Sequence, residues 1–124
     1  MKIVKLSDIK GMTFPAGRTT RVLTGPDLLP TKNFTAGYVV IEPKGRIPLH
    51  AHSNEEIYIF LKGMARVKVG VEEETVEAIS ALYIEPDAEH FLQNVGEDEV
   101  IMVFVYSPPG IAAHWFKEIA GELK

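Results

Sequence analysis

Three strong metal ligands lie within seven residues of this chain: His50, His52 and Glu56, in the pattern His-x-His-x3-Glu. On an extended strand, residues two positions apart project to the same face, so His50 and His52 point together while Ala51 points away. Neutral imidazoles suit Zn, Cu, Fe and Ni, and a carboxylate also admits Mn. The spacing therefore predicts a site for one divalent transition metal ion.

A second segment, residues 84–94, supplies a fourth ligand. Its histidine, His90, comes after a Pro-Asp turn, and Asn94 follows four residues later. Three histidines and one carboxylate leave open positions on an octahedral ion, which substrate, water or dioxygen would occupy. The remaining histidine, His114, stands alone in the C-terminal segment and is left out of the predicted metal set.

The two segments resemble the two signature motifs of the cupin superfamily. The first is similar to Gly-x5-His-x-His-x3or4-Glu-x6-Gly, with Gly45 one residue nearer to the histidines and Gly63 at the end. The second is similar to Gly-x5-Pro-x-Gly-x2-His-x3-Asn, with Ile79 in place of the opening glycine and the proline displaced to Pro86. The resemblance covers roughly residues 34–106. It implies a cupin barrel and a bound Fe, Mn, Ni or Zn ion, but no particular reaction.

Composition is that of an ordinary globular chain, since 46% of the 124 residues are hydrophobic and 24% are charged. We therefore expect residues 1–124 to form one domain. The net charge of -4 argues against a nucleic-acid-binding protein, which needs a positively charged surface. The longest apolar run, residues 100–106, is far shorter than the ~18 residues of a membrane span, and the N-terminus has no secretory core. The default expectation is a cytoplasmic protein, and the absence of Cys excludes disulfides and thiolate ligands.

Short apolar or alternating runs recur between turn residues, as in a sandwich or barrel. They predict strands at 33–42, 56–62, 65–69, 74–78, 80–84, 90–95 and 99–106. The predicted fold is a single antiparallel β-barrel, or jelly roll, with its core at about 34–106.

The two ends of the chain differ from this pattern. Residues 7–32 are rich in Gly and Pro and predict an irregular arm with one short strand near 18–23. Ile111, Trp115 and Ile119 fall at i, i+4 and i+8, which favours one helix over 111–123.

Strand parity indicates what lines the interior. If Glu56 faces the metal, Tyr58 and Phe60 face the same way, which predicts an apolar, aromatic cavity. Tyr58 is the candidate catalytic residue, as a hydroxyl that orients a ligand, and plain core packing is the alternative. Phe60 is a candidate for substrate contact.

A small organic anion would need a cationic anchor beside the open metal site. Arg46, close to the first motif, is the first candidate, and Arg21 in the arm is the second, with Arg18 as its neighbour. A guanidinium binds a carboxylate in bidentate fashion. A solvated surface role is the alternative for each arginine.

Two classes of function stay open. One is a metal-dependent enzyme that acts on a small carboxylate or a sugar-derived substrate, as an oxygenase, isomerase or lyase. The other is a non-catalytic cupin that binds or senses such a ligand. A barrel that kept its fold but not its metal is a third class, which the intact ligand set disfavours. We also expect a homodimer, because Ile57, Ile59 and Leu61 face outward and residues 1–6 could extend a partner's sheet.

Overall fold

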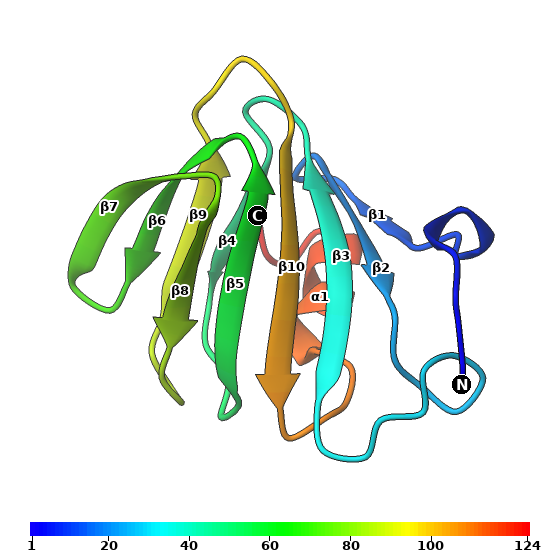
Figure 1. The fold of residues 1–124 in the computed structure, drawn as a ribbon. Helices are drawn as coiled ribbons and strands as arrows, with labels where there is room; N and C mark the ends of the chain where they lie inside the picture. The colour runs from blue at the N-terminus through cyan, green and yellow to red at the C-terminus, as the bar shows by residue number, and fades with distance from the viewer.

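The computed structural model describes all residues 1–124 and places ten strands in two antiparallel sheets (Figure 1). The six-stranded sheet has the order β1 (Met12–Phe14), β2 (Arg18–Val22), β3 (Thr35–Ile41), β10 (Val100–Ser107), β5 (Glu55–Lys62), β8 (Ser80–Ile84). The four-stranded sheet has the order β4 (Arg46–His50), β9 (His90–Asn94), β6 (Met64–Val69), β7 (Glu72–Glu77). Two short helices, η1 (Leu6–Asp8) and α1 (Ala113–Ile119), complete the chain. The predicted all-β jelly roll is confirmed.

The core follows from alternation along the central strands. β10 pairs with β3 on one side and β5 on the other, and every second residue of β10 is buried. Its inward side chains are Val100, Met102, Phe104 and Tyr106. This is the period of a strand with one face on the core, and it turns the aromatic end of β10 toward the metal ligands.

The C-terminal helix differs from its predicted form. α1 begins at Ala113 and ends at Ile119, and Ile111 and Ile119 are 65% and 51% exposed. The buried side chains of α1 are Trp115 and Glu118. The predicted C-terminal helical segment is confirmed, but it is shorter than 111–123, and of the three residues in its apolar period only Trp115 is buried.

α1 packs on the inner side of the six-stranded sheet, behind β3 and β10 in the view of Figure 1. The ring of Trp115 lies 6.3 Å from that of Phe14 and 5.9 Å from that of Phe104, centroid to centroid. The helix thus covers the interior near the metal ligands. No helix of the structure has the length and apolar character that crossing a membrane requires.

Candidate metal centre

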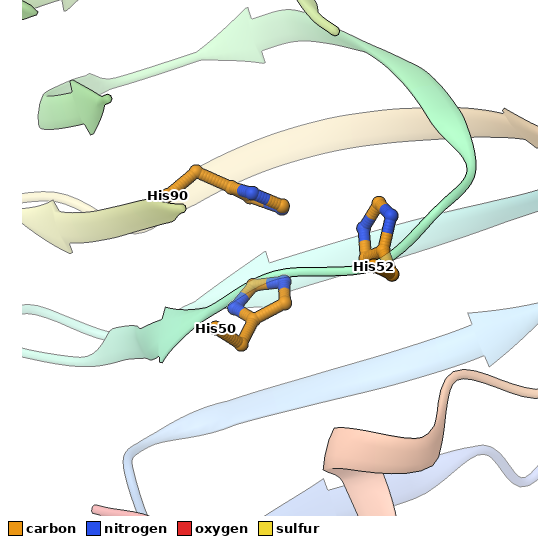
Figure 2. A group of neighbouring side chains, drawn as sticks. All are labelled: His50, His52 and His90. Carbon is orange, nitrogen blue, oxygen red and sulfur yellow. The ribbon is translucent and has the colours of Figure 1, made fainter. Parts of the chain in front are cut away.

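The three predicted histidine ligands meet at one end of the four-stranded sheet. His50 ends β4 and His90 begins β9, and these two residues are opposite each other in the antiparallel register. His52 lies in the loop that follows β4 and turns back toward them (Figure 2). One ring nitrogen from each histidine lies within 4.8 Å of the other two.

Backbone contacts orient all three imidazoles. Nδ1 of His50, His52 and His90 lies 2.7, 3.1 and 2.8 Å, respectively, from a carbonyl oxygen two residues away. A carbonyl only accepts, so Nδ1 carries the proton in each ring. Nε2 is then the ring nitrogen left for a metal or another partner, which is the arrangement that metal-binding histidines use.

The remaining contacts fit a cation. Nε2 of His90 is buried without a hydrogen-bond partner, and Oε1 of Glu56 lies 3.4 Å from it and 3.1 Å from Nε2 of His52. Burial opposes ionisation of Glu56, but the nearby imidazoles of His52 and His90 together outweigh it and lower its pKa. The hydrogen bond to Glu56 raises the pKa of His52. Without a metal, a hydrogen bond joins Nε2 of His52 and Oε1 of Glu56, and a divalent ion would take the place of its hydrogen.

The ligands line a small, partly open cavity. Its volume is about 30 Å³, and its walls include His50, His52, Glu56, Tyr58 and His114. This is room for about two water molecules. The cavity in this conformation therefore favours ligands of few atoms.

The inward direction predicted for Tyr58 and Phe60 is confirmed, since their side chains are 3% and 0% exposed. Tyr58 lines the cavity, whereas Phe60 packs behind it with ring centroids 6.2 Å apart. Burial, and then the charge of Glu56, raise the pKa of Tyr58 well above its ordinary value. Tyr58 is thus a hydroxyl donor and not a base at neutral pH. A substrate contact by Phe60 stays a prediction that this placement does not favour.

Neither predicted anion anchor reaches the cavity wall. Arg21 donates from Nε to the carbonyl of Ile9 at 2.8 Å, and Arg46 is half-buried on β4. Their roles in substrate binding stay predictions, without support from their placement. Arg18 does line the cavity, but its guanidinium is engaged by both carboxylate oxygens of Glu118.

Sequence analysis missed a second cluster, made of Arg18, Glu118 and His114. The ring of His114 stacks on that of His50, and its Nδ1 lies 2.8 Å from Oε2 of Glu118. Burial opposes ionisation of Glu118, yet hydrogen bonds from Arg18 and His114 lower its pKa. Burial lowers the pKa of His114. A signal was present, because His114-x3-Glu118 repeats the spacing of His52-x3-Glu56.

The glycine and asparagine of the two motifs shape the backbone around the ligands. Nδ2 of Asn94 donates to the carbonyls of Ile41 and Asp98 at 3.0 and 2.9 Å, which fixes the end of β9. A Cβ on Gly45 would lie 2.3 Å from the carbonyl oxygen of Gly17, so only glycine fits there. Asn94 is therefore a structural residue and not a ligand.

Comparisons with known proteins agree with this geometry. The chain is 29% identical over 108 residues to polyketide synthase CurC of Streptomyces cyaneus, covering 86% of this chain and 70% of that protein. The oxalate decarboxylase of Lactobacillus farciminis, in a formate complex, matches with a TM-score of 0.78 at 26% identity, over 90% of this chain and 35% of that one. A recombinant oxalate oxidase in complex with glycolate matches with a TM-score of 0.73 at 26% identity, over 89% and 61%.

The sequence model of one family extends over more than half of the chain. It is described as the cupin domain, and it matches residues 37–106, which include the four predicted ligands and most of both sheets. The protein therefore belongs to the cupin family.

Proposed function

We propose that this cupin is a metal-dependent enzyme that binds one divalent ion through His50, His52, His90 and Glu56 and acts on a small monocarboxylate. The observation that carries the proposal is the convergence of ring nitrogens from three histidines, with Nε2 of His90 buried and unpaired. A buried nitrogen without a partner costs about 1–3 kcal/mol. Coordination of an ion removes that cost.

The donor set defines the class of ion. Three imidazoles and one carboxylate suit Fe, Mn, Ni or Zn, and they leave positions for an exogenous ligand. When bound, the ion supplies a Lewis acid that polarises an oxygen of the ligand.

Charge favours a monoanion as that ligand. A +2 ion with one carboxylate, Glu56, keeps a net charge of about +1, and the charges of Arg18 and Glu118 cancel in their own pair. In a cavity of low dielectric constant, one carboxylate neutralises the site, whereas a dianion leaves an excess negative charge. The volume of about 30 Å³ also favours a few-atom acid over a sugar derivative.

The similar oxalate decarboxylase and oxalate oxidase support a small acid as substrate, since their structures are complexes with formate and glycolate. The residues of this chain would bind and orient such an acid. Tyr58 keeps its proton and donates from its hydroxyl, while α1 contributes His114 and Trp115 to the cavity wall.

Metal analysis of the purified protein, followed by calorimetry with formate, glycolate and oxalate, tests the proposal. We expect binding of the monocarboxylates to the metal-loaded protein and none to the metal-free protein. Carbon-13 NMR of the incubated acids then tests turnover. Equal binding with and without metal would refute the proposal, and binding without turnover would identify a ligand-binding cupin instead.

A further inference from the structure

The residues beyond the family match bring a fourth histidine to the metal centre. The match ends at residue 106, and α1 follows it. From α1, His114 places its ring on that of His50, with centroids 3.7 Å apart and planes inclined by 23°. His114 also lines the cavity that the metal ligands share.

Contacts behind His114 fix its orientation. Glu118 accepts a hydrogen bond from Nη2 of Arg18 at 2.6 Å and a second one from Nη1. The side chains of Arg18 and Glu118 are only 2% and 1% exposed. A carboxylate held by a buried guanidinium is ionised and only accepts hydrogen bonds. Nδ1 of His114, 2.8 Å from Oε2 of Glu118, must therefore carry the ring proton.

This leaves Nε2 of His114 as an acceptor with no partner in the protein. Nδ1 makes the only hydrogen bond of the ring, to Glu118. The only fully buried side-chain nitrogen or oxygen without a partner is Nε2 of His90, so Nε2 of His114 is not fully buried. Because the ring of His114 lines the cavity, an acceptor that it presents there would select a ligand with a hydrogen to donate.

We propose that His114 contacts the substrate, with Nε2 accepting a hydrogen bond from a hydroxyl of an acid held at the metal, and that Arg18 and Glu118 are positioning residues for it. The ligand class is then a small 2-hydroxy monocarboxylate, which carries one carboxylate for the ion and one hydroxyl for His114. This inference rests on the proposed function, because the carboxylate must first occupy the open metal position. It adds to that function a residue, His114, that would distinguish a hydroxy acid from an acid without a hydroxyl.

Calorimetry with glycolate and acetate on metal-loaded protein tests the contact, since the two acids differ by one hydroxyl. His114→Phe keeps a ring to stack on His50 but has no acceptor. We expect it to weaken glycolate binding about tenfold and to leave acetate binding and metal content unchanged. Lys117→Ala, on the exposed face of α1, is the matched control and should bind both acids as the wild type does.

The outcomes separate the two proposals. Glycolate binding that is the same in wild type and His114→Phe would overturn the role of His114 while the proposed function stands. No binding of either acid to the wild type would overturn both. Nitrogen-15 NMR of the metal-free protein reads the tautomer of His114 independently of any ligand, and a proton on Nε2 in place of Nδ1 would overturn the positioning role of Glu118.

Discussion

The ring of His114 on α1 stacks on the ring of His50 on β4, with centroids 3.7 Å apart. An aromatic pair of this kind contributes about 0.5–1.5 kcal/mol beyond the burial of its area. The C-terminal helix and the metal centre are therefore coupled directly, ring on ring.

Replacing His52 by Ala should lower the affinity for a divalent ion by at least about tenfold, because one of three converging Nε2 donors is lost. Equilibrium dialysis followed by elemental analysis measures the effect. His114→Phe is the control, since His114 is outside the predicted ligand set, and it should keep the wild-type metal content. Wild-type affinity in His52→Ala would remove His52 from the site.

Breaking the Arg18–Glu118 pair from one side should be costly. Glu118→Ala leaves a guanidinium that is 2% exposed without its anion, which typically costs about 3–5 kcal/mol. Replacing both residues by Met should be far milder, because no buried charge is left unpaired. Urea unfolding of the two variants measures the difference. Equal destabilisation would show that the lost packing, and not the uncompensated charge, dominates.

Acid should destabilise the protein through the same pair. The pKa of Glu118 is lowered in the folded state, so its contribution to stability is complete above the unfolded pKa of about 4.3 and is lost as pH falls through the lowered value. Glu56 acts in the same direction. Urea midpoints at pH 7, 5, 4 and 3 should fall below pH 5, and less steeply in the variant with Met at both positions of the pair. If the urea midpoints of the wild type and of this variant fell in parallel with pH, the loss of stability in acid could not be assigned to Glu118.

Gly37→Ala should disturb the cavity from behind. Gly37 on β3 pairs with Phe104 on β10, and a Cβ at Gly37 would lie 2.2 Å from the ring of Phe104. Overpacking of this kind costs about 1–3 kcal/mol. Thermal unfolding measures it, and Gly96→Ala is the matched control, because its nearest neighbour would be at 3.7 Å. A melting temperature equal to that of the control would show that the ring of Phe104 moves aside for the added Cβ without a loss of stability.

The homodimer stays a prediction, and the outer face of β5 supports it. Ile57 and Leu61 are 36% and 44% exposed on that face. Static light scattering at micromolar concentration should give twice the 13.8 kDa mass of the chain. Replacing both residues by Lys should halve the measured mass if this face forms the interface. A monomeric wild type would contradict the prediction.

The metal ligands and the central strands could be predicted because their signals are local. His50 and His52 are two residues apart, and the alternation of β10 is continuous in the sequence. Strand parity alone placed Tyr58 and Phe60 inside. Each of these inferences depends on one segment and on the geometry of a strand.

The C-terminal helix could not be predicted in the same way. Its apolar period includes Ile111 and Ile119, which are exposed, whereas the structure buries Glu118 because Arg18, 100 positions away, supplies the opposite charge. No local pattern reveals such a partner. His114 was set aside for the same reason, since its role depends on where α1 docks.

The covered cavity has a kinetic consequence. It has room for about two water molecules, and α1 lines it with His114 and Trp115, while Glu118 of the same helix is anchored on Arg18. If a ligand of several atoms needs α1 to move aside, the motion of the helix sets the rates at which the ligand enters and leaves. Association rates should then level off at the opening rate of α1 as ligand concentration rises, whichever acid is used. Residence time at this metal centre is thus a property of the helix, and loosening the Arg18–Glu118 pair shortens it without a change in any metal ligand.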